Sequence, residues 1–82
     1  MLIERKKVQT VKVATPFLPE VSMFPHYRLM PSESGKQTYS LFFHISPQHF
    51  LILDGGIRRY PALAKLALMT ETAPYPIYEV EK

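Results

Sequence analysis

Alternation of apolar and polar side chains is clearest between residues 37 and 45. Every second position there is apolar, which gives one set made of Tyr39, Leu41, Phe43 and Ile45. Because successive side chains of a strand point to opposite faces, this pattern predicts a strand with that set in the core. Phe42 is the exception on the other face, where its neighbours are polar. An apolar ring on a polar face indicates either a second packed layer or a contact surface.

Weaker patterns predict further strands on both sides of this one. Residues 6–13 alternate loosely and predict a half-buried strand. Pro25 has no backbone N–H to donate, so another strand is expected to begin after it, at about His26. Residues 50–53 are apolar at every position, which is typical of a central strand covered on both faces. Asp54-Gly55-Gly56 is expected to end that strand.

Residues 58–69 are rich in Ala and Leu and predict a helix of about ten residues. Pro61 suits its first turn, where the missing N–H has no intrahelical acceptor in any case. Lys65 is the only charge after Arg59, so the helix is expected to lie against the sheet. The prolines at 74 and 76 prevent its continuation, and residues 77–80 predict a short last strand.

The order of these elements predicts an α+β fold. It consists of a small, mainly antiparallel sheet of four to five strands with one helix packed on one face. A partly open barrel is the alternative, since short strands can also curl. The 82 residues contain no repeat and no linker, and a chain of this length has room for one core. A single globular domain over 1–82 is therefore expected.

Composition narrows the class of protein. A hydrophobic fraction of 46% against 21% charged residues is too apolar for a disordered chain. No apolar run approaches the ~20 residues that a membrane helix needs, and residues 1–7 lack the apolar core of a secretion signal. A cytoplasmic protein without membrane contact is expected. The chain has no Cys to reinforce a small core, and free strand edges are expected, so a homo-oligomer is predicted.

Candidates for chemistry are few. His44, Ser46 and His49 lie close in sequence around a predicted turn, but no Cys is present and the nearest acid is Asp54. Zinc sites need three or four ligands with oriented neighbours, and the seven acids of the chain are scattered. No G-x-S-x-G motif is present. The expectation is therefore a protein that is not an enzyme, with no catalytic residue, metal or cofactor.

Basic residues gather in two places and give a formal net charge of +3. One is Arg5-Lys6-Lys7, and the other is Arg58-Arg59, which follows Gly55-Gly56 at the start of the predicted helix. Glycine N–H groups, a helix N-terminus and two arginines together can hold a phosphate. The fingerprints of phosphate-binding loops are absent, however, and Asp54 repels an anion. A flexible connection between strand and helix is the favoured interpretation.

By elimination, the sequence predicts a small non-enzymatic binding protein that docks on another macromolecule. The favoured partner is a protein, with the chain acting as an adaptor, inhibitor or regulator and Phe42 in the contact. The alternative is nucleic acid, because a basic arm can follow a phosphate backbone. The residues for that alternative are Arg5, Lys6, Lys7, Arg58 and Arg59.

Overall fold

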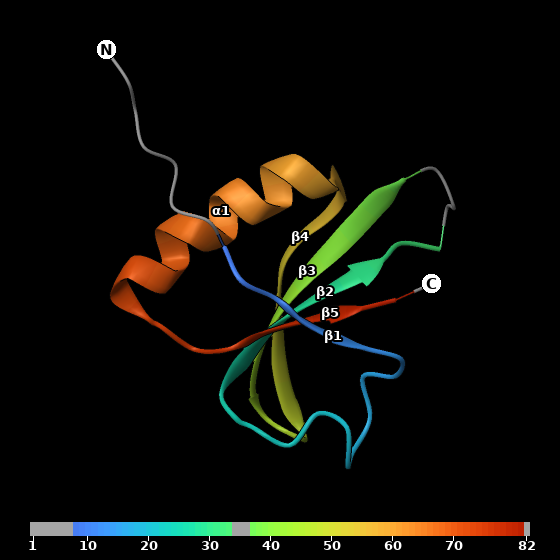
Figure 1. Ribbon diagram of the computed structural model, residues 1–82, viewed down its shortest axis with the longest axis vertical. Helices are drawn as coiled ribbons and strands as arrows, with labels where there is room; N and C mark the ends of the chain where they lie inside the picture. Colours follow the sequence, from blue (N-terminus) through green and yellow to red (C-terminus); the bar gives the residue numbers. More distant parts are fainter. Residues whose placement is uncertain (1–7, 34–36, 82) are drawn as a thin grey trace.

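Five strands and one helix make up the described part of the chain, residues 8–33 and 37–81 of a computed structural model. In chain order they are β1 (Val11–Val13), β2 (His26–Pro31), β3 (Thr38–Ser46), β4 (His49–Arg58), α1 (Arg59–Thr72) and β5 (Ile77–Val80). Figure 1 shows α1 lying across one face of the sheet. The predicted α+β class, with one helix packed on one face, is confirmed.

The sheet is open and has the strand order β1-β5-β2-β3-β4. β5 is inserted between β1 and β2 and runs parallel to both, whereas β3 is antiparallel to β2 and to β4. The antiparallel ladders are the longer ones, so most of the pairing is antiparallel, as predicted. The outer strands β1 and β4 do not pair with each other, and the barrel alternative is therefore wrong.

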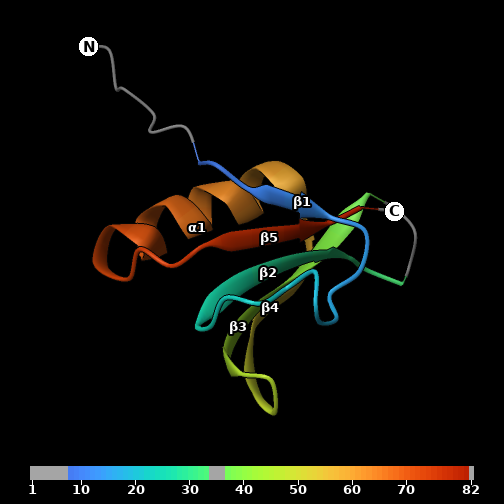
Figure 2. The same ribbon diagram turned by 60° about the horizontal axis from the view of Figure 1, so that its bottom comes forward.

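The main core lies between the sheet and α1. Its fully or almost fully buried members come from four elements and are Tyr27, Leu29, Leu41, Ala62, Leu66 and Ile77. Leu41 has no exposed surface, which agrees with the alternation of β3. Ile45 is 50% exposed, because it lies at a register shift of the β3–β4 ladder, in the part of the hairpin that projects away from the helix (Figure 2). The far half of this hairpin therefore has no helix over it.

A second, smaller core covers part of the opposite face. The chain between β1 and β2 folds back over this face and buries Val21 against β1 and β5, in a cluster with Val13, Tyr78 and Val80. Over β3 and β4 this cover is only partial, since His44 is 8% exposed and Phe50 is 50% exposed. Phe42 lies there, half-buried. Phe42 is not among the residues of the second core, and its place in a contact surface stays a prediction.

The strand predicted to be central is at the edge. β4 pairs with β3 and, among the described residues, with nothing else. Phe50, Leu51 and Ile52 are 50, 55 and 68% exposed. A run that is apolar on both faces normally marks a strand with neighbours on both sides, and this one has a neighbour on one side only.

The pair Gly55-Gly56 bends β4 instead of ending it, so that prediction is also wrong. Between the pairs Tyr39↔Ile57 and Leu41↔Asp54, both glycines oppose the single residue Ser40. This is a β-bulge, and Gly56 adopts the left-handed φ of 68° that such bulges need. Pairing then resumes up to Arg58. The helix begins at Arg59 and has 14 residues, more than predicted.

An ion pair fastens the start of α1 to the sheet. Arg59 Nε and Nη2 donate to the two carboxylate oxygens of Glu79 at 2.8 and 3.0 Å. Thr10 Oγ1 donates to Glu79 Oε1 at 2.9 Å. Glu79 is 5% exposed, and its hydrogen bonds to Arg59 hold the pKa of the carboxyl below its ordinary value against the opposing effect of burial. This contact joins three segments that are distant in sequence.

The N-terminal strand is shorter than predicted. The predicted strand over residues 6–13 is reduced to Val11–Val13, and residues 6 and 7 lie outside the described residues. Within the described residues, the structure contains no helix with the length and apolar character required to span a bilayer.

Candidate functional site

A groove of about 350 Å³ opens on the face opposite the helix. One wall is the segment between β1 and β2, which contributes Pro16, Phe17, Leu18, Val21 and Phe24. The sheet and the β3–β4 turn contribute His26, Arg28, His44, Pro47 and Phe50. Most of this lining is apolar, and the exceptions come together on β2 and β3. This combination of apolar walls and a few convergent polar groups is typical of a ligand site.

Two stacked histidines lie at the sheet side of the groove. His26 and His44 are opposite each other on β2 and β3, and their rings are 5.0 Å apart and within 9° of parallel. They are only 1% and 8% exposed. His26 Nδ1 is 2.8 Å from the Met23 carbonyl oxygen. Because a carbonyl oxygen only accepts, Nδ1 carries the hydrogen and the neutral ring keeps Nε2 as an acceptor.

Three buried polar atoms in this cluster have no hydrogen-bond partner. They are His26 Nε2, His44 Nε2 and Arg28 Nε. Buried polar atoms are almost always paired in folded proteins, because leaving one unpaired costs about 1–3 kcal/mol. Three such atoms from residues that line one groove mark the polar part of the site.

Arg28 is the only formally charged side chain of the groove lining. It is half-buried, and burial lowers the pKa of its guanidinium. The guanidinium carbon lies 4.9 Å from the centre of the Phe42 ring, directly across the β2–β3 ladder. It forms no ion pair with a described carboxylate. The groove therefore carries one uncompensated positive charge.

Aromatic rings extend this surface towards β4. The Phe50 ring stacks on His44 at 5.2 Å and meets the Phe42 ring edge-on at 5.9 Å. Phe24 lies 4.7 Å from the His26 ring. The open half of the sheet is thus an aromatic platform that leads from the groove to the free edge.

Burial fixes the charge state of the histidines. Desolvation lowers the pKa of His44 to about 4, with further lowering by the nearby charges of Arg28 and His26. The pKa of His26 is lowered by the same two effects, burial and Arg28, although its bond to Met23 opposes them. Both rings are therefore neutral at pH 7.

Acidification is expected to destabilise the protein through His44. The unfolded histidine has a pKa of 6.5 and the folded one about 4, so the stability it contributes is complete above 6.5 and is lost as the pH falls towards 4. The linkage predicts a loss of about 2 kcal/mol between pH 7 and pH 5. Urea melts of the wild type and of His44→Gln across this range measure it. The dependence should shrink in His44→Gln and persist in the matched variant of the exposed His49, His49→Gln.

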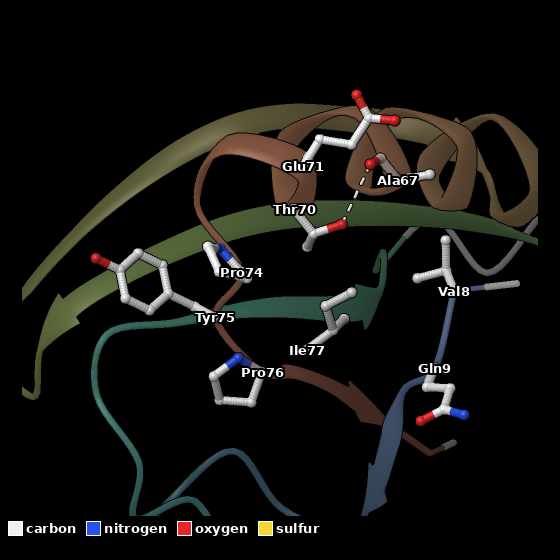
Figure 3. A pocket seen from close by; sticks show the side chains of 9 residues that line it. All are labelled: Val8, Gln9, Ala67, Thr70, Glu71, Pro74, Tyr75, Pro76 and Ile77. Atoms are coloured by element: carbon white, nitrogen blue, oxygen red, sulfur yellow. Dashed lines mark hydrogen bonds between the residues drawn. The ribbon is translucent and has the colours of Figure 1, made fainter. Parts of the chain in front are cut away.

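A second hollow lies on the other side of the molecule, between the end of α1 and β5. It measures about 360 Å³ and is lined by residues of α1, the following turn, β5 and the segment before β1 (Figure 3). Its threonine is already satisfied, because Thr70 Oγ1 donates to the carbonyl oxygens of Leu66 and Ala67 at 2.8 and 3.2 Å. The lining offers no cluster of unpaired polar atoms, so the groove near Arg28 is the stronger candidate.

The candidate residues from the sequence fall in different places. Phe42 lies on the aromatic platform. Arg58 is exposed at the N-cap of α1, whereas Arg59 forms an ion pair with Glu79. The glycines of the proposed phosphate loop are inside β4, in the bulge. Arg5, Lys6 and Lys7 lie outside the described residues.

The histidine group around the β3–β4 turn is divided. Ser46 Oγ and His49 Nδ1 are 3.1 Å apart on the surface, while His44 is buried in the groove cluster. Among residues 8–33 and 37–81, no group of three His, Cys, Asp or Glu side chains could hold a metal ion.

The cluster of His26, Arg28 and His44 was missed by the sequence analysis. A signal was present, because alternation places 26 and 28 on one face of β2 and 42 and 44 on one face of β3. The pairing register that brings these faces together depends on the turn between the strands and was not predicted.

Comparisons with family models, curated proteins and solved structures find no match for this chain.

Proposed function

We propose that the protein is a non-enzymatic binding module that docks on another protein by accepting an extended segment along β4. The observation that supports this most directly is the free edge of β4, with exposed apolar side chains on both faces. Extended peptides add to such edges through main-chain hydrogen bonds, and side-chain contacts on alternate positions give specificity.

The edge lacks the usual protection against pairing. Natural edge strands are kept apart by Lys, Pro, inward charges, bulges or very short length. β1, the opposite edge, has three residues, whereas β4 has ten. Residues 49–52 contain no Lys, Pro or acid, and the irregularities of β4, at Leu53 and at Gly55-Gly56, come only after them. This half of β4 is thus suited to receive another strand.

Side chains beside the edge complete the docking surface. Leu51 lies on the helix side of the sheet, opposite Phe43, and Ile52 lies on the other side, opposite Phe42. A strand added to β4 would place alternate side chains next to these two faces. Phe42 would then contact the partner from the neighbouring strand, as the sequence analysis proposed.

Among the described residues, charge favours a protein partner over nucleic acid, while Arg5, Lys6 and Lys7, three candidates for the alternative, lie outside them. The described residues contain five Lys and Arg side chains (Lys12, Arg28, Arg58, Arg59 and Lys65) and six acids (Glu20, Glu33, Asp54, Glu71, Glu79 and Glu81). Arg59 is paired with Glu79, and Lys65 lies 3.3 Å from Asp54. A nucleic-acid surface needs several unpaired cations along one track. The described surface offers no such track.

Photo-crosslinking followed by affinity measurement tests this proposal. The photoreactive amino acid p-benzoylphenylalanine in place of Ile52 should crosslink a partner protein that mass spectrometry identifies, and the same probe in place of Leu68 should not. Leu68, on α1, is 70% exposed and provides the matched control. Ile52→Lys should then weaken binding of the identified segment by about tenfold or more, and Leu68→Lys by less than about twofold.

Three results would contradict the proposal. Equal effects of Ile52→Lys and Leu68→Lys would remove β4 from the interface. Crosslinks confined to a second copy of this chain would replace a foreign partner with self-pairing, the homo-oligomer predicted from the sequence. Submicromolar, salt-dependent binding of an arbitrary oligonucleotide at physiological ionic strength would favour the nucleic-acid alternative.

A further inference from the structure

The groove beside Arg28 is a second surface, and its chemistry can be read separately from that of β4. It has a polar end, formed by His26, Arg28 and His44, and apolar walls. Phe17 and Leu18, at 71% and 58% exposure, stand on one side, and Phe50 stands on the other. A ligand that enters the groove must match both its polar end and its apolar walls.

The polar end requires an anion of low charge. Arg28 supplies a single positive charge, and no described carboxylate is paired with it. A guanidinium presents two parallel N–H donors that match the two oxygens of a carboxylate. A phosphate group would bring more charge than one arginine balances. The cation therefore fits a monocarboxylate.

The histidines require a hydrogen-bond donor near that carboxylate. His26 Nδ1 already donates to Met23, so Nε2 of the neutral ring accepts. His44 Nε2 also has no partner, and it is a second acceptor in the neutral tautomer that carries its hydrogen on Nδ1. A carboxylate alone would leave both acceptors unpaired.

A metal ion does not fit this pair of nitrogens. The lone pair of an imidazole nitrogen lies in the plane of its ring, and the two rings are stacked within 9° of parallel. Their lone pairs therefore run side by side and do not converge on one ion. The guanidinium of Arg28 would in addition repel a cation.

One common group carries a carboxylate, an adjacent N–H donor and an apolar body. This group is the last residue of a peptide chain. Its amide nitrogen and its carboxylate carbon are bonded to the same Cα, and its side chain can be apolar. We propose that the groove binds the C-terminal residue of a peptide with an apolar or aromatic side chain. Arg28 binds the carboxylate, and the side chain packs among Phe24, Phe50 and Leu18. The histidine Nε2 atoms are buried in this structure, so the groove wall must move for one of them to accept the amide N–H. This proposal does not depend on docking at β4.

NMR titration of the full chain with labelled histidine rings provides the test. N-acetyl-L-phenylalanine should shift the ring signals of His26 and His44 saturably, with a Kd of about 1 mM or tighter for a ligand of this size. N-acetyl-L-phenylalaninamide, which lacks only the carboxylate charge, should bind at least about tenfold more weakly. Acetate should also bind at least about tenfold more weakly, because it lacks both the N–H donor and the apolar body.

Variants locate the carboxylate. Arg28→Gln should weaken binding of N-acetyl-L-phenylalanine by about tenfold or more, while Arg58→Gln, at an exposed arginine outside the groove, should leave it unchanged within about twofold. Arg28→Lys keeps the charge without the two-donor geometry and should show an intermediate loss. The comparison of acid and amide on the wild type needs no variant, so it holds even if Arg28→Gln does not fold.

Two peptides separate the sources of the ligand. A hexapeptide ending in a free phenylalanine that binds more tightly than N-acetyl-L-phenylalanine supports a chain terminus. An amidated hexapeptide with an internal Glu-Phe that binds as tightly as the free C-terminus overturns the proposal. Equal binding of acid and amide, unchanged binding by Arg28→Gln, or no shift of either histidine ring also overturns it. None of these results involves Ile52, so they are distinct from a failure at β4.

Discussion

Replacing Leu41 by alanine is expected to lower the free energy of unfolding by about 3 to 5 kcal/mol. Leu41 has no exposed surface and packs between β2 and α1 in the main core. Its truncation removes apolar contact area and leaves a cavity that neighbours on two rigid elements cannot fill. A domain of 82 residues has little stability to lose, so this variant is expected to be largely unfolded at room temperature.

Denaturant melts that compare three alanine variants of β3 measure this effect. Ile45 is on the same strand but is 50% exposed, so Ile45→Ala should lower the free energy of unfolding by less than about 1.5 kcal/mol. Ser40, on the other face, should tolerate alanine within about 0.5 kcal/mol. Equal losses for Leu41→Ala and Ile45→Ala would show that α1 does not cover the sheet as described.

Breaking the ion pair between α1 and β5 is the other change with a large expected effect. Arg59→Met should destabilise the protein by about 2 to 3 kcal/mol, because it leaves the Glu79 carboxylate buried without a cation. The value is below that of a fully buried pair, since the Arg59 side chain is 44% exposed. Thr10 also still donates to Glu79 Oε1 in this variant.

Replacing Glu79 instead of Arg59 should lower the free energy of unfolding by a smaller amount. In Glu79→Gln the unpaired group is Arg59, which can turn to water, so a loss of about 1 to 2 kcal/mol is expected. The double variant should be more stable than Arg59→Met alone, since no buried charge remains. A double-mutant cycle by urea melts provides these values. A double variant less stable than Arg59→Met would rule out a buried unpaired carboxylate as the cause.

The same pair defines a pH window. The folded pKa of Glu79 is below its ordinary value of 4.5, so the stability from the pair is complete above that value and is lost as the pH falls through the folded pKa. The difference between wild type and Arg59→Met should therefore be largest near neutral pH and shrink in acid.

The elements with local signals were predictable from the sequence. Alternation around Leu41 identified β3 and its core face, Pro25 gave the start of β2, and the run of Ala and Leu gave α1. These signals depend on side-chain periodicity and on a missing N–H group, both of which act within a few residues. The fold class follows from them.

The arrangement of these elements depends on contacts that periodicity does not encode. An apolar run such as 50–53 looks the same at a sheet edge and at its centre, and only the position of β5 decides which it is. Gly55 and Gly56 signal a break in regular pairing, but a bulge and a chain turn both require one. The groove cluster depends on the register between β2 and β3, and Arg59 is distinguished from Arg58 only by its contact with Glu79.

The insertion of β5 has a consequence for the order in which the chain can acquire its structure. The residues of β1 are synthesised before those of the other strands, yet the strand partner of β1 is β5. The pair Val11↔Tyr78 closes a loop that spans most of the sequence. β2, β3, β4 and α1 follow one another and meet mainly through near neighbours, so they can assemble while the chain is still growing. Pairing across a long loop carries a large entropic cost and is slow to form. β1 can therefore join the sheet only after β5, the last of the five strands, has been synthesised.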